Sequence, residues 1–212
     1  MIVILDYGMG NSGSILNMLK RVGSPAIVTN KKEDILLADG IILPGVGTFD
    51  NGMKALQSLD LVDSLNEKSV EGSTPFLGIC LGMQLLFESS CEGSMSGLGW
   101  VNGTVQKFNF SSCIDSNKLK IPHMGWNSVN VKDCQGIFKD LVVESRFYFV
   151  HSYYVNCANP KNILATADYG GVFTCAVHSG NIYGVQFHPE KSHLFGITMF
   201  KNFLQIVNDA KN

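Results

Sequence analysis

The residue best suited to covalent chemistry is a cysteine that is flanked by two glycines. Cys80 follows the apolar run 75–79 and has Gly78 and Gly82 two positions away on either side. Glycines so placed permit the tight strand-turn-helix elbow that presents the serine nucleophile of G-x-S-x-G hydrolases. With cysteine at the apex, a helix expected over 83–87 would stabilise the thiolate through its positive end. Free cysteines are often simply buried, so the flanking glycines are the reason to expect a nucleophile.

A base and an acid that could serve this thiol lie far along the chain, at His188 and Glu190. Pro189 disfavours the helical conformation for the residue before it, and in an extended segment residues two apart project to the same side. The carboxylate could then fix the tautomer of the imidazole, as the third member of a triad does. A lone histidine in a strand is more often a core residue, but the glutamate and the elbow favour a Cys80-His188-Glu190 triad.

Further motifs accompany these residues, and together they resemble a known family. The sequence is similar to the triad-type glutamine amidotransferases, and specifically to the glutaminase subunits of imidazole glycerol phosphate synthases. The elbow and His-Pro-Glu occur across the wider superfamily, whereas Pro-Gly-Val-Gly and His-Met-Gly-Trp-Asn narrow the resemblance to this type of subunit. The matching segments span nearly the whole chain: 6–11, 44–47, 75–84, 121–127, 149–154 and 186–192.

The resemblance implies a fold and a reaction. The fold would be α/β, with a central, mostly parallel sheet flanked by helices and extended by antiparallel strands. The chain would hydrolyse L-glutamine to glutamate through a γ-glutamyl thioester on Cys80, with no cofactor and no metal. The ammonia would pass to a (β/α)8-barrel synthase subunit, the partner in a heterodimer, which makes imidazole glycerol phosphate in histidine biosynthesis. Free ammonia would be protonated in water and lost, which favours a sealed passage.

Two backbone amides are candidates for the oxyanion hole that acyl transfer requires. One is the amide of Leu81, the residue after the nucleophile. The other would come from the loop 44–47, which follows an expected strand; in the resembling family it is the Val46 peptide that must reorient to complete the hole. Proline and glycine also mark ordinary turns, so the residues alone leave a plain turn as an equal alternative.

The resemblance also assigns residues to the substrate. Glutamine would be held by Gln84 and by backbone around Gly47, Ser152 and Tyr153. Gln84 lies one helical turn after Cys80, which would place both on one face. The alternative is a glutamine that simply faces solvent.

The partner interface is predicted mainly by resemblance, with Trp126 as its anchor. An exposed tryptophan suits a binding hot spot, but tryptophan at strand or helix spacing is more often a core residue, and the pattern alone favours the core. The other four histidines, at 123, 151, 178 and 193, are given no catalytic role. The interface candidates are Asn11, Met124, Trp126, Asn127, Tyr148 and Lys191.

Other functions remain as alternatives. Segment 8–13 is a literal G-x-G-x-x-G, but Asn30 stands where a dinucleotide site needs an acidic residue. A nucleotide-binding module without catalysis and a cysteine peptidase-like hydrolase are therefore the alternatives of another class. Within the family, segments 50–52 and 193–196 depart from the histidine-pathway pattern. They favour a paralogous amidotransferase that supplies ammonia for an amidated or aminated surface sugar.

Composition agrees with a compact enzyme. The 212 residues suit one domain over 1–212, and a net charge of −2 provides no basic field for nucleic acid. No apolar run reaches the length of about 18 residues that suggests a membrane span, and the first residues lack the features of a signal peptide, so neither a membrane nor an exported location is expected. We expect a cytoplasmic protein. Six cysteines without a C-x-x-C pair indicate neither zinc nor a disulfide framework.

Alternating apolar runs and helical periodicities predict the order of elements. Parallel strands are expected over 2–5, 26–29, 40–43 and 76–79, with helices near 15–22 and 53–70. Antiparallel strands are expected over 104–108, 128–131, 147–150, 163–167, 172–177 and 181–185. A closing helix carries apolar residues from 197 to 207, with Ser192 as its expected cap.

Overall fold

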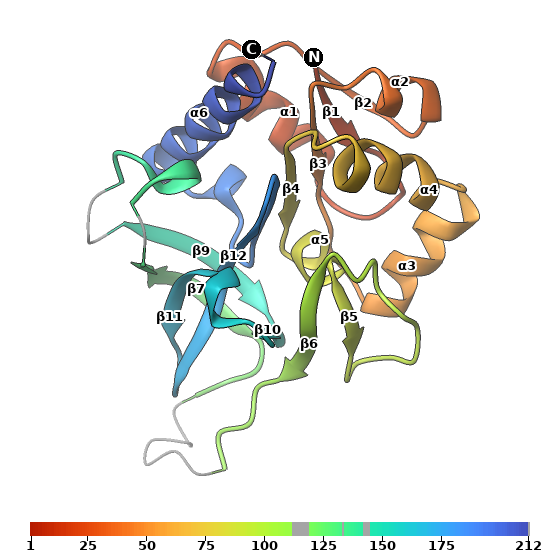
Figure 1. Cartoon of the computed structure of the whole chain (residues 1–212). Helices are drawn as coiled ribbons and strands as arrows, with labels where there is room; N and C mark the ends of the chain where they lie inside the picture. Colours follow the sequence, from red (N-terminus) through yellow and green to blue (C-terminus); the bar gives the residue numbers. More distant parts are fainter. Residues whose placement is uncertain (112–118, 133, 142–144, 212) are drawn as a thin grey trace.

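The computed structural model of the chain describes residues 1–111, 119–132, 134–141 and 145–211. Its first half alternates strands and helices, and the four strands predicted there have the predicted bounds (Figure 1). Runs of isoleucine, valine and leucine between glycine, proline and asparagine residues account for this agreement. The elements are β1 (Ile2–Leu5), α1 (Ser12–Arg21), β2 (Ala26–Thr29), α2 (Lys32–Leu36), β3 (Gly40–Leu43), α3 (Phe49–Ser58), α4 (Val62–Leu65), a π-helical segment η1 (Asn66–Glu71) and β4 (Phe76–Ile79).

The second half is rich in strands and ends in a long helix. Its elements are α5 (Leu81–Gln84), β5 (Phe87–Ser90), β6 (Val101–Lys107), β7 (His123–Ser128), β8 (Asn130–Val131), β9 (Arg146–His151), β10 (Tyr153–Cys157), β11 (Ile163–Asp168), β12 (Val172–Ser179), β13 (Ile182–Val185) and α6 (His193–Asp209), with 3-10 turns η3 (Gly136–Phe138), η4 (Pro160–Asn162) and η5 (Pro189–Lys191).

The described strands form one large sheet and a separate two-stranded sheet. The large sheet runs β2-β1-β3-β4-β13-β12-β10-β6-β5, with β11 and β8 beside β12. Strands β2, β1, β3, β4 and β13 pair in parallel, and β12, β10 and β6 continue the sheet antiparallel. The predicted α/β sheet with antiparallel additions is confirmed. β13, expected among the antiparallel strands, is parallel to β4, and this pairing brings the segment after β13 beside the elbow after β4.

Two local predictions are wrong, and a third, the cap at Ser192, is right in its position alone. The helix expected over 83–87 ends at Gln84, because Phe87 begins a strand that pairs with β6. The strand expected over 128–131 is two strands, because β7 pairs with β9 whereas β8 pairs with β11. Ser192 precedes α6, but its side chain makes no capping bond; instead its Oγ donates to the His188 carbonyl and accepts from the Tyr148 amide.

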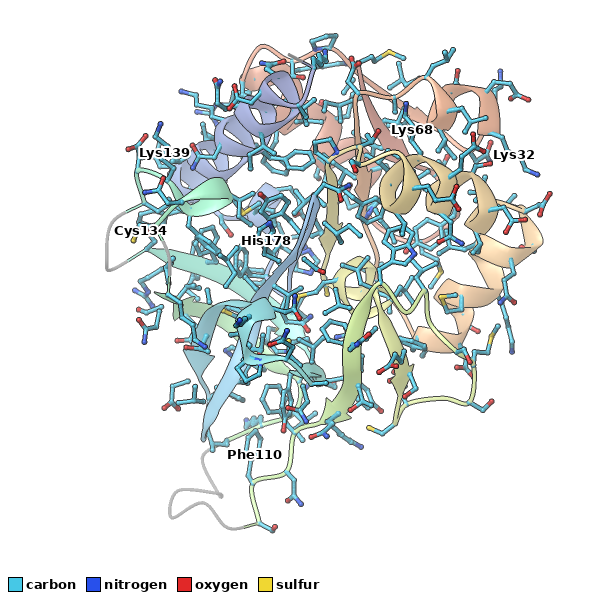
Figure 2. All side chains as sticks on the ribbon, viewed as in Figure 1. Lys32, Lys68, Phe110, Cys134, Lys139 and His178 are labelled. Carbon is cyan, nitrogen blue, oxygen red and sulfur yellow. The ribbon has the colours of Figure 1, made fainter. Side chains whose placement is uncertain are left out.

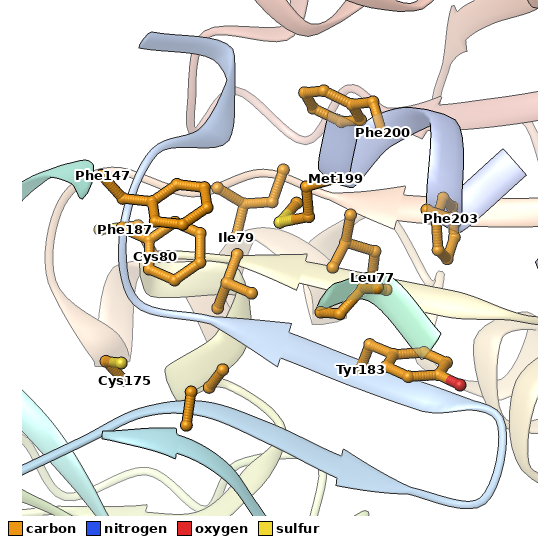
Figure 3. Packing of buried hydrophobic residues seen from close by; sticks show 14 of the residues in the cluster. Leu77, Ile79, Cys80, Phe147, Cys175, Tyr183, Phe187, Met199, Phe200 and Phe203 are labelled. Carbon is orange, nitrogen blue, oxygen red and sulfur yellow. The ribbon is translucent and has the colours of Figure 1, made fainter. Parts of the chain in front are cut away.

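The sheet separates two hydrophobic clusters. Alternate residues of β1 point to opposite faces, Ile2 and Ile4 toward one cluster, Val3 and Leu5 toward the other. The first cluster lies under α1 and α6 and the second under α3 and α4, and side chains fill both layers (Figures 1 and 2). In Figure 3 Cys80 lies at the same end of the first cluster as the stacked rings of Phe147 and Phe187.

None of the helices in the described ranges is long and apolar enough to cross a membrane. Five cysteines in those ranges are free thiols, and Cys113 lies outside the described residues.

Candidate active site

Cys80 occupies a strained elbow between β4 and α5. Its backbone has φ 55° and ψ −109°, a region that residues with a side chain rarely adopt. A Cβ on Gly78 would lie 2.6 Å from the Gly82 carbonyl oxygen, and a Cβ on Gly82 would overlap the Leu43 carbonyl oxygen. Both glycines are therefore required by the tight turn, and the elbow predicted from their spacing is present.

His188 and Glu190 meet beside this elbow. The Nδ1 atom of His188 is 2.8 Å from Oε1 of Glu190, and the two side chains are only 4% and 3% exposed. The contact was predicted, but the local geometry differs: His188 is extended, whereas Pro189–Lys191 form the 3-10 turn η5. Glu190 therefore reaches the imidazole through a tight turn and not along an extended strand.

The electrostatics of His188 reflect two acidic neighbours. Burial lowers its pKa, but interactions with Cys80 and with Glu190 outweigh burial and raise it to about 10. Its Nε2 atom is buried and has no hydrogen-bond partner among the described residues. One ring nitrogen is thus fixed by the glutamate while the other remains available for proton transfer.

One of the two expected oxyanion donors is already engaged in a hydrogen bond. The Leu81 amide donates to the Gly45 carbonyl at 3.3 Å, so the loop itself occupies this donor. The Val46 side chain is 48% exposed, at the surface of the loop. The buried hydroxyl of Tyr7 donates to the Pro44 carbonyl at 2.6 Å, which gives the loop a second tie.

A cavity of about 340 Å³ opens at the thiol and contains the expected substrate residues. Gln84 is buried, so the alternative of a solvent-facing glutamine is wrong. Its Nε2 donates to the Tyr153 carbonyl at 3.2 Å and to Gln186 Oε1 at 3.0 Å, which leaves Oε1 as its acceptor. The cavity is lined by Val46, Gly47, Cys80, Leu81, Gln84, Glu92, Pro122, Val150, His151, Ser152 and Tyr153.

Glu92 is a cavity residue that the sequence analysis missed. Its Oε2 accepts from the Phe49 amide at 2.8 Å. Asp50 holds the same loop by accepting from the amides of Ser94 and Met95, and these hydrogen bonds lower the pKa of Asp50. Nothing near Glu92 in the sequence marks it, because it reaches the cavity from a loop between β5 and β6.

Five of the six candidate interface residues lie on or beside strand β7, whereas Asn11 lies at the start of α1. Trp126 is 40% exposed, so the expectation of a core tryptophan is wrong. Its ring stacks on His193 at 5.3 Å between centroids and meets the edge of Tyr148, over which Lys191 lies. Met124 is exposed on the same strand, and Asn127 is half-buried. Asn11 caps α1 by accepting from the Ser14 amide, a structural role that the sequence analysis did not assign.

No group of three or more histidine, cysteine, aspartate or glutamate residues among the described residues could hold a metal ion.

The comparisons with known proteins agree with this geometry. The family model described as glutamine amidotransferase class-I matches residues 3–207. The chain is 55% identical over 205 residues to imidazole glycerol phosphate synthase subunit HisH 2 of Methanococcus maripaludis, covering 97% of this chain and 99% of that protein. It is 47% identical to the subunit HisH 2 of Pseudomonas aeruginosa, covering 98% and 100%.

Solved structures share the fold. A glutamine amidotransferase structure aligns with a TM-score of 0.73 at 19% identity, covering 98% of this chain and 100% of that one. The structure of PurLQS from Thermotoga maritima aligns with a TM-score of 0.69 at 19% identity, covering 100% and 98%. Because the family model and the full-length relatives agree with the elbow at Cys80, the chain belongs to the class-I glutamine amidotransferases.

Proposed function

We propose that this chain hydrolyses L-glutamine to glutamate and supplies the ammonia to a synthase subunit that makes imidazole glycerol phosphate in histidine biosynthesis. The observation that carries the proposal is the strained thiol of Cys80, placed beside the buried His188–Glu190 pair and open to a cavity of about 340 Å³. The similar proteins of Methanococcus maripaludis and Pseudomonas aeruginosa bear the name of that synthase subunit, which supports the same reaction.

The chemistry begins with attack of the Cys80 thiolate on the γ-carboxamide carbon of glutamine. The carbonyl π electrons move to oxygen, and the amide hydrogens of Leu81 and Val46 would stabilise this oxyanion. Imidazolium His188 gives its Nε2 proton to the departing nitrogen, so the C–N bond breaks and ammonia leaves a γ-glutamyl thioester. His188 then takes a proton from water, whose hydroxide displaces the sulfur and releases glutamate.

The cavity suits both ends of glutamine. The Oε1 acceptor of Gln84 and the carboxylate of Glu92 are complementary to an α-ammonium group. Backbone at Gly47, Ser152 and Tyr153 lines the same cavity and would hold the rest of the substrate. Glu190 fixes the ring of His188 throughout.

The partner would be a (β/α)8 barrel that docks on the surface formed by Met124, Trp126, Tyr148 and Lys191. This surface combines an exposed tryptophan, a methionine and a cation, the composition of a binding hot spot. Docking there would form the heterodimer and seal a passage for ammonia. Asn127 lies on the same strand, and Asn11 belongs to the loop beside Pro44.

A paralogous role in surface-sugar amination is the second candidate. It is favoured by His193, which stacks on Trp126, and by Leu194, which is 72% exposed beside it. These residues depart from the histidine-pathway pattern at the surface where the partner would dock. The same chemistry at Cys80 would then serve a different acceptor.

A growth assay distinguishes the two candidate acceptors of ammonia. A histidine-auxotrophic host that lacks its own glutaminase subunit receives this chain and the barrel subunit from the same organism. We expect growth without histidine at low ammonia. Cys80→Ala in the same host should grow only when ammonium salts are added. Failure of the wild type, despite a stable complex and measurable glutaminase activity, would reject the histidine pathway and favour the sugar.

A further inference from the structure

The helix that follows Cys80 is short. α5 comprises only Leu81–Gln84, so the contribution of a helix end is smaller than the sequence suggested. The structure places a side-chain donor at the sulfur instead: Nε2 of Gln186 lies 3.7 Å from Sγ of Cys80. Gln186 is fully buried and sits just after β13, beside the elbow.

Neighbouring groups fix which end of the Gln186 carboxamide faces the sulfur. The Tyr153 carbonyl can only accept, so the Gln84 atom 3.2 Å from it must be the nitrogen. The same nitrogen lies 3.0 Å from Gln186, so the Gln186 atom at that contact must be the oxygen. The remaining Gln186 nitrogen therefore points its hydrogens toward Cys80.

A pair of buried histidines extends this hydrogen-bond network from the Tyr153 carbonyl toward strand β7. His151 Nδ1 donates to the Tyr153 carbonyl at 2.8 Å, and its Nε2 then accepts from His123 Nδ1 at 3.0 Å. His123 Nε2 accepts from Asn127 Nδ2 at 3.3 Å. Burial lowers the pKa of His123 to about 4 and that of His151 to about 3, so both rings are neutral near pH 7 and each carries its hydrogen on Nδ1.

We propose that Gln186 is a further catalytic residue, whose carboxamide donates a hydrogen bond to the Cys80 sulfur and stabilises the thiolate. His151 donates to the same Tyr153 carbonyl as Gln84, so it is a positioning residue that holds this carbonyl in place, and His123 orients the ring of His151. The inference rests on the proposed thiol chemistry and deepens it. It assigns to the glutamine before the Phe-His-Pro-Glu segment a role distinct from that of Gln84.

Several side chains around the sulfur are ionisable, whereas the carboxamide of Gln186 is not. His188 and Tyr7 interact electrostatically with Cys80, and His151 and Glu92 line the same cavity. A change at Gln186 therefore leaves the number of ionisable groups unaltered. Its effect should appear as a displacement of the pH at which the thiol becomes reactive, with no new step in the profile.

Alkylation measures this property without glutamine. The rate at which iodoacetamide modifies Cys80 is followed from pH 5 to 10 by peptide mapping, which separates Cys80 from exposed Cys91 and Cys134. For Gln186→Leu we expect the rate at pH 7 to fall roughly ten- to a hundredfold, the range for a hydrogen bond to a charged group, and to recover at alkaline pH. Gln186→Met, which keeps the length of the side chain, should behave alike and serves if the leucine variant does not fold.

Asn181→Leu is the matched control, because Asn181 is a half-buried amide that donates to the Ser69 and Thr74 carbonyls, away from the thiol. It should leave the alkylation profile of Cys80 unchanged even if it lowers stability. His151→Phe should reduce the alkylation rate less than Gln186→Leu does, whereas His178→Phe should have no effect (His178 is labelled in Figure 2).

The two proposals can fail separately. An unchanged alkylation profile in folded Gln186→Leu and Gln186→Met would overturn the role of Gln186, even if glutamine hydrolysis were lost through the KM. If the wild-type thiol reacts quickly, the Gln186 variants react slowly and no variant or wild-type complex hydrolyses glutamine, the proposed function fails while the role of Gln186 stands.

Discussion

The two sides of the Cys80 sulfur differ in how completely they are assembled. On the side of the base, His188 and Glu190 are buried and joined at 2.8 Å, and Gln186 reaches the sulfur. On the side of the oxyanion, the Leu81 amide is occupied by a loop carbonyl, and Val46 is exposed. The proposed nucleophile is therefore prepared in the free chain, whereas one of the two proposed oxyanion donors is occupied.

This difference indicates where a partner could control the reaction. Buried groups that are hydrogen-bonded to one another resist rearrangement because each broken hydrogen bond leaves a desolvated group. Among the described residues, Leu81 and Tyr7 donate hydrogen bonds to carbonyls of the loop 44–47, and the loop lies partly in solvent. The proposed partner subunit could shift this loop at a smaller cost than it could shift the buried His188–Glu190 pair.

The largest expected effect comes from removing the sulfur. Cys80→Ala should lower glutamine-dependent turnover by about 10⁴-fold or more, as loss of an essential triad member commonly does. Ammonia-dependent synthesis by the complex should persist, because the partner does not need the thiol when ammonia is supplied. Both rates are measured on the same purified complex, and a variant that keeps a tenth of the glutaminase rate would show that Cys80 is misassigned.

The assembled side is tested next through Glu190. Glu190→Gln keeps the size of the side chain but removes the charge that supports protonated His188, and we expect glutaminase activity to fall by roughly 10³-fold. Ammonia-dependent synthesis is again the control.

The same variant has a pH signature. The folded-state pKa of His188 is raised to about 10, so its stabilising contribution is complete below the unfolded value of 6.5 and is lost as the pH rises through about 10. The stability advantage of the wild type over Glu190→Gln should therefore shrink between these pH values in denaturant unfolding. A difference that stays constant with pH would contradict the ion pair.

The sequence predicted the assembled side well because its determinants are local. The glycines of the elbow and the His-Pro-Glu segment specify tight backbone geometry within five residues, so the elbow at Cys80 and the contact between His188 and Glu190 could be predicted without a structure. The four parallel strands were placed correctly for a similar reason. Short, continuous apolar runs between glycine, proline and asparagine are typical of buried parallel strands when helices alternate with them.

What the sequence did not reveal depends on contacts between distant segments. Gln186 reaches Cys80 only because β13 pairs in parallel with β4, and Glu92 reaches the cavity from a separate loop. All of strand β7 except Ser128 was missed, because His123 is buried while Met124 and Trp126 are exposed, which inverts the usual alternation. This inversion agrees with the proposed partner surface.

The unassembled side is tested through Val46. Val46→Pro removes the amide hydrogen that the reoriented loop would offer, and one missing oxyanion donor commonly costs about 10²- to 10³-fold in rate. We expect this loss in the complex, whereas the isolated wild-type chain should already be about 10²-fold slower than the complex. Val46→Ala, which retains the amide hydrogen, is the matched control. Full activity in the isolated wild-type chain would contradict the incomplete oxyanion hole.

The smallest expected effect concerns the tie between Tyr7 and the loop. The phenol of Tyr7 is buried, and burial together with the nearby Cys80 raises its pKa, so it stays protonated and donates to the Pro44 carbonyl at 2.6 Å. Tyr7→Phe removes this hydrogen bond and keeps the ring. If the bond holds the loop in its closed arrangement, its loss of about 0.5–1.5 kcal/mol should raise the glutaminase rate of the isolated chain by roughly two- to tenfold.

In the complex the loop would already be open, so Tyr7→Phe should change the rate there less than twofold. The ratio of the two rates, complex over isolated chain, is therefore the quantity to measure, because a general loss of stability would lower both. A fall in the isolated chain together with an unchanged complex would mean that Tyr7 supports the open loop instead. The hydrogen bond from the Leu81 amide to the Gly45 carbonyl would then be the contact that holds the loop closed.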